Sequence, residues 1–173
     1  IFAGAKGNLS RIHDAVQTYD LLSRTRYYGD ADLNIPTGHA SRVAKGIGLA
    51  LKAGTLNPAA ACNALNIIRY GRQALTFRNL FRIVPFLDNG RYDILHCHFG
   101  PCGMDAAFLK ELGALHGKIV TTFHGYDITQ YLNHAGTHVY DALFETGDLF
   151  LPISTRWKEK IISMGCKDNK IRV

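Results

Sequence analysis

His124 stands at the point where the sequence predicts that a strand ends. Residues 121–127 read Thr-Thr-Phe-His-Gly-Tyr-Asp, so this histidine follows a β-branched and aromatic stretch. Gly125 permits a tight turn directly after it, and Tyr126 and Asp127 follow in the same loop. An imidazole in this position could donate a hydrogen bond to a sugar hydroxyl or a phosphate, or take part in acid–base chemistry. The alternative is a histidine whose hydrogen bonds are satisfied at a strand edge.

His96 and His98 lie two residues apart on another predicted strand and therefore face the same side of it. One interpretation is a metal pair of the kind that amidohydrolase-type barrels carry, with Cys102 and His124 as further ligands. No obvious carboxylate completes that set, and too little chain follows for a barrel of ~250 residues. We favour one histidine in the core and one at a cleft. The sequence therefore predicts no metal and no cofactor, and a metal-dependent hydrolase that uses this pair ranks third among the hypotheses.

The run Gly-Pro-Cys-Gly at residues 100–103 is predicted to begin a helix directly after that strand. The free N–H groups of such a helix start, beginning with Gly100, can hold an anion, but we favour a tight strand–helix connection. A dinucleotide or P-loop site has no support, because neither glycine motif is present. Cys97 and Cys102 have no obvious base near them and are interpreted as small packing residues.

Four arginines recur along two predicted helical segments and alternate with aromatic residues: Arg69, Arg72, Arg78 and Arg82. Arg78 and Arg82 share a helix face. This region could attract the anionic lipids of a membrane, or it could be a solvated face whose aromatic rings turn toward the core. The net charge of +6 agrees with an anionic membrane surface or a phosphorylated substrate. Nucleic acid is not expected, because no recognised motif accompanies the charge.

The elements that must position these residues alternate between strands and helices in the second half of the chain. A buried strand is predicted at residues 92–99 and further strands at 118–123 and 149–153, with another beginning at 170. Helices are predicted at 100–115, 138–146 and 155–164. This alternation predicts parallel βαβ units, whose ligands bind at the carboxyl ends of the strands. His98, His124 and Ser154 stand at those ends. Ser154 is also a good N-cap for the last helix, and Gly165 a good stop for it.

The first half of the chain is predicted to be mostly helical. A short strand at residues 1–4 precedes a helix at 10–22 and a loop at 24–38. Further helices are expected at residues 41–54, from 57 onward, and at 77–87 near a proline. On the second of these, Ala61, Leu65 and Ile68 are expected to form one buried stripe.

The composition fits one α/β domain with a hydrophobic core, since 47% of the 173 residues are hydrophobic and 20% are charged. No apolar run approaches the ~18–20 residues that span a bilayer. The four cysteines do not have the density of a secreted disulfide framework, which favours a reducing cytoplasm. The chain begins without methionine, so we expect it to be a processed or partial sequence.

Three of the motifs together resemble glycosyltransferase family 4. Residues 92–100 are similar to the family's D-(I/V)-(I/V)-H-x-H strand, and residues 121–127 to its (T/S)-x-H-(G/D)-x-(D/E) turn. Residues 149–173 resemble the strand, serine-capped helix and glycine that precede the family's second domain. The motifs occur in the family's order with compatible spacing. The Phe-Gly-Pro and His-Gly-Tyr-Asp variants look similar to bacterial exopolysaccharide and colanic-acid-type enzymes.

The resemblance implies a GT-B fold, in which two Rossmann-like domains, each a parallel sheet with flanking helices, face each other across a cleft. Residues 1–169 would form the N-terminal, acceptor-side domain with a helical insertion at 41–88, and residues 170–173 would begin the connection to a donor-binding domain. A nucleotide-diphosphate sugar would bind mainly to that second domain. A saccharide or lipid-linked acceptor, at the inner face of the cytoplasmic membrane, would bind to the first. Sugar transfer would retain the anomeric configuration.

The resemblance also implies roles for single residues. His124 matches the family histidine that projects into the cleft near the donor sugar, where it orients and polarises and does not attack as a nucleophile. The substrate-binding residues expected on the acceptor side are His98, Gly100, Gly125, Tyr126, Asp127 and Ser154.

Two departures from the family pattern shape the expectation for this chain. It lacks the family's opening strand with its first loop, and it lacks the donor domain, so we expect that it does not turn over by itself. The alternative is a stand-alone carbohydrate or lipid-phosphate binding module without catalysis.

Overall fold

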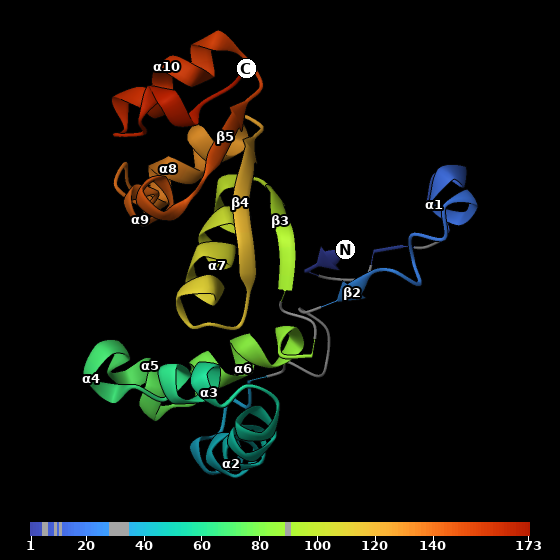
Figure 1. Ribbon diagram of the computed structural model, residues 1–173, viewed down its shortest axis with the longest axis vertical. Coiled ribbons are helices and arrows are strands. Elements are labelled where there is room, and N and C mark those ends of the chain that lie inside the picture. Colours follow the sequence, from blue (N-terminus) through green and yellow to red (C-terminus); the bar gives the residue numbers. More distant parts are fainter. Residues whose placement is uncertain (5–6, 9, 11, 28–34, 89–90) are drawn as a thin grey trace.

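A three-stranded parallel sheet carries the second half of the chain in the computed structural model, which describes residues 1–4, 7–8, 10, 12–27, 35–88 and 91–173 (Figure 1). The strands β3 (Arg91–His98), β4 (His116–Phe123) and β5 (Leu149–Pro152) lie in that order and are all parallel. Their register sets Cys97 beside Thr121, and Thr121 beside Phe150. The predicted parallel α/β architecture is therefore confirmed.

Helix α7 (Gly100–Glu111) follows β3 at once and packs on β3 and β4. Its close approach depends on Gly103, where an added Cβ would lie 2.5 Å from Thr121 Oγ1. Helix α9 (Asp141–Thr146) packs against α7, as Figure 1 shows beside the sheet. The core between these layers is aromatic and aliphatic, and its largest fully buried side chains include Tyr140, Phe123 and Phe150.

The last helix, α10 (Thr155–Ser163), has the ends that the sequence predicts. The Ser154 hydroxyl accepts the N–H of Trp157, and Gly165 follows the C-cap with a φ of +102°. The turn after β4 was harder to foresee: it forms the short helices η4 (Tyr126–Ile128) and α8 (Gln130–Ala135), which the sequence did not indicate. The expected last strand is reduced to η5 (Asp168–Lys170) and a single bridge between Ile171 and Phe150.

The middle of the chain forms a helical layer below the sheet in Figure 1. It consists of α2 (His39–Leu56), α3 (Pro58–Ala64), α4 (Ile67–Tyr70), α5 (Arg72–Leu75), α6 (Arg78–Ile83) and the 3₁₀ turn η3 (Val84–Phe86). Small side chains let α2 and α3 approach closely, since Ala53, Ala60 and Ala64 are fully buried.

The prediction that Ala61, Leu65 and Ile68 form one buried stripe is wrong for Ile68. Helix α3 stops at Leu65, and the Asn66 side chain then accepts the N–H of Arg69 to begin α4 in a new direction. Because the helix does not continue, Ile68 leaves the buried face and is completely exposed.

The first segment forms a small separate sheet. Strand β1 (Phe2–Ala3) pairs in parallel with β2 (Arg26–Tyr27), so the loop expected at 24–38 is wrong at its start, while residues 28–34 lie outside the described part. Helix α1 (Asp14–Thr18) is much shorter than predicted and stands apart from the rest in Figure 1. The Phe2 ring contacts Phe86, which connects this sheet to the helical layer.

Strand β3 was predicted to be buried, and this is wrong for the described structure. Leu95 is its only buried residue, while Ile94 is 60% exposed. The physical reason is that helix α7 packs on the face of β3 that carries Leu95 and Cys97, whereas side chains on the alternate face, such as Ile94, are exposed. None of the helices that the structure describes is both long and apolar enough to cross a bilayer.

Candidate functional site

Asp127 is the centre of the turn that follows β4. Its side chain is fully buried, and its carboxylate accepts three backbone N–H groups. One oxygen takes those of His124 at 3.0 Å and Gly125 at 2.9 Å, and the other takes that of Gly100 at 2.9 Å. A carboxylate that closes on nearby backbone N–H groups fixes a turn. Asp127 therefore joins the ends of two neighbouring strands at the carboxyl edge of the sheet.

This arrangement changes the roles expected of Asp127 and Gly100. Both were expected to contact substrate, but both are buried, and the anion held at the start of α7 is the protein's own carboxylate. A side chain at Gly100 would meet Tyr140, since an added Cβ would lie 2.5 Å from its ring. The Tyr140 hydroxyl donates to the carbonyl of Asp127 at 2.8 Å. Gly100, Asp127 and Tyr140 therefore support the turn that carries His124. Of the two interpretations of residues 100–103, the tight strand–helix connection fits the structure.

His98 and His124 meet above this support. His98 Nδ1 lies 3.0 Å from His124 Nε2, and the two rings stack at 25°. His96 lies beside His98 with ring centroids 4.7 Å apart and the ring planes tilted by 33°, and its Nε2 lies 2.9 Å from Thr122 Oγ1. His96 and His98 are both exposed, so the expectation that one histidine of this pair lies in the core is wrong. The reason is that both lie on the exposed face of β3, opposite the face on which α7 packs.

The surroundings of His98 affect its protonation. The pKa of His98 is lowered by desolvation, and then by the neighbouring His96 and His124, because positive charge nearby disfavours the protonated form of His98. The shared hydrogen bond between His98 and His124 needs one donor and one acceptor nitrogen. His124 is half-buried, so part of its side chain is open to solvent.

Phe99 holds a strained backbone at the junction between β3 and α7. Its φ is +72° and its ψ is 143°, a region that residues other than glycine rarely adopt. Its N–H donates to the carbonyl of Thr122, and its ring packs on His124 with centroids 4.5 Å apart. Strain of this kind concentrates at functional sites. Here it sets an aromatic ring against the candidate catalytic imidazole.

The remaining predicted site residues lie around the same edge. Tyr126 is 56% exposed on η4, next to the turn. Gly125 has a φ of +99° and lies against Trp157 of α10. Ser154 begins α10 and its hydroxyl is used as the helix cap. The structure thus brings the three strand ends together, as the parallel topology predicts, and leaves Tyr126 and the imidazoles as the groups that face outward.

The cysteines near the site are poor nucleophiles. Burial, with smaller effects from Cys102 and Asp105, raises the pKa of Cys97 to about 12. The pKa of Cys102 is also raised by burial. Since the thiolate is the reactive form, neither thiol is activated. Cys97 packs against the core as interpreted, whereas Cys102 is exposed, so the packing interpretation is wrong for it. Nowhere in the described part of the chain do three or more histidine, cysteine or acidic side chains gather in a way that could hold a metal ion.

The four arginines of the helical layer do not behave alike. Arg69 pairs with Glu111 at 2.7 Å, and Arg82 pairs with Asp105 at 2.5 Å. Arg72 and Arg78 are exposed and have no ion pair with a described residue. These arginines lie on the helical layer, away from the histidines at the carboxyl edge of the sheet (Figure 1).

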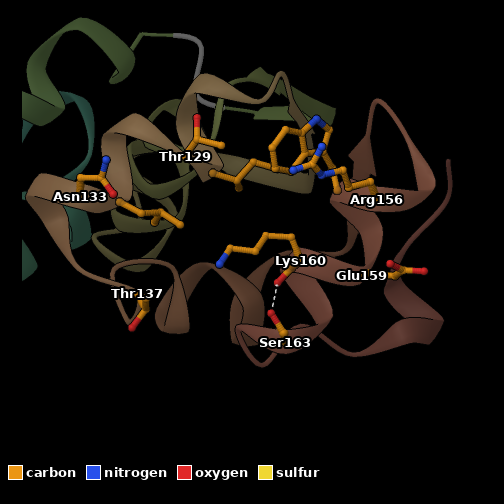
Figure 2. Close-up of a pocket in the computed structure, with 10 residues that line it drawn as sticks. Thr129, Asn133, Thr137, Arg156, Glu159, Lys160 and Ser163 are labelled. Carbon is orange, nitrogen blue, oxygen red and sulfur yellow. Dashed lines mark hydrogen bonds between the residues drawn. The ribbon is translucent and has the colours of Figure 1, made fainter.

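A pocket of about 590 Å³ opens beside the turn, between the η4–α8 segment and α10 (Figure 2). It is lined by hydroxyl, amide and charged side chains that include Thr129, Asn133, Arg156 and Lys160. Sequence reasoning missed it, because its walls come from two segments some thirty residues apart in the chain and its cations resemble an ordinary solvated helix face. Asp127 carried a signal that was available: an aspartate three residues after a strand-end histidine is well placed to bind that turn's N–H groups.

A family model and the similar curated proteins all refer to glycosyltransferases. The family described as Glycosyltransferase Family 4 matches residues 49–173. "Putative colanic acid biosynthesis glycosyltransferase WcaL" of Escherichia coli strain K12 is 38% identical over 182 aligned positions, which cover 100% of this chain and 41% of that protein. "Amylovoran biosynthesis glycosyltransferase AmsK" of Erwinia amylovora is 35% identical over 175 positions, covering 100% of this chain and 42% of that protein. The chain thus spans well under half the length of these relatives. No solved structure matches it.

Proposed function

This chain belongs to glycosyltransferase family 4, and from that premise we propose that it forms the acceptor-side half of an enzyme that transfers a sugar. The donor is a nucleotide-diphosphate sugar, held mainly by a second domain. The acceptor is a saccharide or a lipid-linked saccharide. The names of the relatives, which refer to colanic acid and amylovoran biosynthesis, support a role in bacterial exopolysaccharide synthesis.

One observation carries this proposal: the His124 imidazole stands at the carboxyl end of β4 on a turn that a buried carboxylate fixes. In parallel sheets this edge is where ligands bind. A ring whose backbone is held in place gives a preorganised hydrogen-bond donor, which stabilises developing charge without reorganisation. His124 orients and polarises the reacting groups, and it is not the nucleophile. The exposed Tyr126 lies on the acceptor side of the same edge.

The reaction is proposed to retain the anomeric configuration of the donor sugar. The protein expressed from its complete reading frame would be incubated with a panel of nucleotide-diphosphate sugars and a lipid-linked saccharide acceptor. Release of the nucleotide diphosphate would identify the donor, and the ¹H NMR coupling constant of the new anomeric proton would give its configuration. Retention supports the proposal. Inversion would contradict the mechanism, and absence of release with every donor would contradict the transferase.

We also propose that the enzyme works peripherally at the inner face of the cytoplasmic membrane, through α4 and α5. Ile68 is fully exposed, and Ile67 and Leu75 are more than half exposed. The exposed Arg72 lies next to these apolar side chains in the chain and has no ion pair with a described residue. Apolar side chains flanked by cations are the composition that anionic lipid interfaces attract.

Vesicle sedimentation tests this surface with a matched pair of variants. Arg72→Gln, combined with Ile68→Ser, should weaken sedimentation with phosphatidylglycerol vesicles and leave the negligible binding to phosphatidylcholine unchanged. Arg82→Gln removes the same charge from a side chain that is already paired with Asp105, and it should have little effect. Equal losses from the two changes would show that the net charge acts, and not this surface.

A further inference from the structure

Two cations of α10 face the pocket between the η4–α8 segment and that helix. Lys160 and Arg156 both line it, and neither has a carboxylate partner among the described residues. Figure 2 shows the ammonium end of Lys160 reaching into the space. Glu159 also lines the pocket, and its carboxylate points away from Lys160. Lys158, by contrast, pairs with Asp168 at 2.7 Å and does not line the pocket. The helix therefore turns its unpaired cations toward the pocket.

The other lining groups suit a ligand that bears hydroxyl groups. Thr129, Thr137, Asn133 and Ser163 add hydroxyl and amide groups to walls that also include the apolar Ile128 and Leu132. The Thr129 and Ser163 hydroxyls donate to backbone carbonyls, so they offer a ligand their acceptor lone pairs. Arg156 lies over the ring of Trp157, with its guanidinium carbon 5.4 Å from the ring centroid. The indole offers a flat apolar face, and the guanidinium beside it offers a positive charge. The volume of about 590 Å³ falls in the range of small-molecule sites.

The pocket is joined to the His124 turn. Thr129, on its wall, donates through its hydroxyl to the carbonyl of Gly125 at 2.7 Å. Trp157 lies against Gly125 on the same side. A ligand in the pocket would therefore contact the two side chains that border the turn carrying His124.

We propose that this pocket binds the phosphate or diphosphate group of a phosphorylated saccharide. Lys160 and Arg156 hold the anionic group, and the hydroxyl and amide side chains hold the sugar. The assignment rests on the proposed function and deepens it, because it makes the acceptor a phosphate-bearing one and places its charged end beside the reaction centre.

The chain carries its own probe, since Trp157 is its only tryptophan. Inorganic pyrophosphate and farnesyl diphosphate would be titrated into the 173-residue chain while the indole fluorescence is followed, and calorimetry would give an independent affinity. Lys160→Gln should weaken binding roughly tenfold or more, because it removes one charge-assisted contact. Lys158→Gln, on the same helix, should change affinity by less than about twofold. Urea midpoints of both variants would confirm that the fold is kept.

The outcomes distinguish a lipid-linked phosphate from a soluble one, and they test the pocket separately from the proposed sugar transfer. Tighter, Lys160-dependent binding of farnesyl diphosphate assigns the ligand to a lipid-linked acceptor. Equal, Lys160-dependent binding of both probes shows that the diphosphate is recognised without a lipid contribution, which supports a soluble phosphorylated ligand. Binding that is absent, or equally weakened by the Lys158 variant, overturns the site. Because no donor is present in these titrations, the site can fail while sugar transfer survives, and sugar transfer can fail while binding persists.

Discussion

The carboxylate of Asp127 accepts the N–H of Gly100 across 27 residues of sequence, at 2.9 Å. This bond connects the first residue of α7 with the turn that carries His124. The same carboxylate also binds the N–H groups of His124 and Gly125. One buried side chain thus fixes the relation between two strand ends, and the predictions below follow from it.

Asp127→Asn should destabilise the fold by about 2–3 kcal/mol, because an amide nitrogen would face a backbone N–H and leave two buried donors opposed. Urea denaturation at pH 7 would measure the change in the free energy of unfolding. Asp105→Asn is the control, since Asp105 forms an exposed ion pair with Arg82 and its loss should cost less than about 1 kcal/mol. Equal effects of the two changes would refute the positioning role of Asp127.

Gly100→Ala should cost about 1–3 kcal/mol, because its Cβ would lie 2.5 Å from the Tyr140 ring. Adding Tyr140→Leu should recover part of that loss, so the double variant should lose less than the sum of the two single losses. Gly48→Ala, inside α2 with no atom within 4 Å of its new methyl group, should be neutral or stabilising. Strictly additive losses in the double variant would mean that the two residues do not clash.

Phe99→Gly and Phe99→Ala together separate backbone strain from ring packing. Both remove the ring that packs on His124, but glycine also relieves the strain at a φ of +72°. The glycine variant should therefore be more stable than the alanine variant by about 1–3 kcal/mol, while both lose transferase activity. Thermal unfolding and turnover of the two proteins would test this, and a less stable glycine variant would show that the backbone here is not strained.

His98 gives the site a defined dependence on pH. Its pKa is lower in the folded chain than in the unfolded one, so the unfolded state binds more protons as the pH falls below about 6.5. The stability that this difference contributes is present at neutral pH and is lost as the pH falls through the folded pKa. His98→Gln should flatten the fall in the free energy of unfolding between pH 7 and 5. An NMR titration that places the His98 pKa above its ordinary value would contradict the arrangement of the three rings.

Much of this edge could be predicted from the sequence. The alternation of strands and helices gave the parallel sheet, and the carboxyl-end rule gathered His98, His124 and Ser154 at one edge. The ends of α10 could also be predicted, because Ser154 caps its first turn and Gly165 ends its last turn through contacts between neighbours in the sequence. These features depend on neighbours in the sequence, so their patterns are visible there.

Other features depend on contacts between distant segments. An exposed loop carboxylate and a buried one look alike in a sequence, so Asp127 was assigned to substrate, although Gly100 and Tyr140 enclose it. A fully buried strand is covered on both faces, but only the face of β3 that carries Leu95 and Cys97 packs on α7, and side chains on the alternate face are exposed. The pocket between α8 and α10 was missed because its walls meet only in the fold.

The turnover of the His124→Ala enzyme, expressed from the complete reading frame, tests the central claim most directly. His116→Ala is the matched control, since His116 lies at the opposite end of the same strand and is exposed. We predict that His124→Ala lowers kcat by about 10²–10³, the effect of removing one preorganised hydrogen-bond donor, with an unchanged urea midpoint and with His116→Ala fully active. Undiminished turnover in a folded His124→Ala enzyme would contradict the role of this histidine.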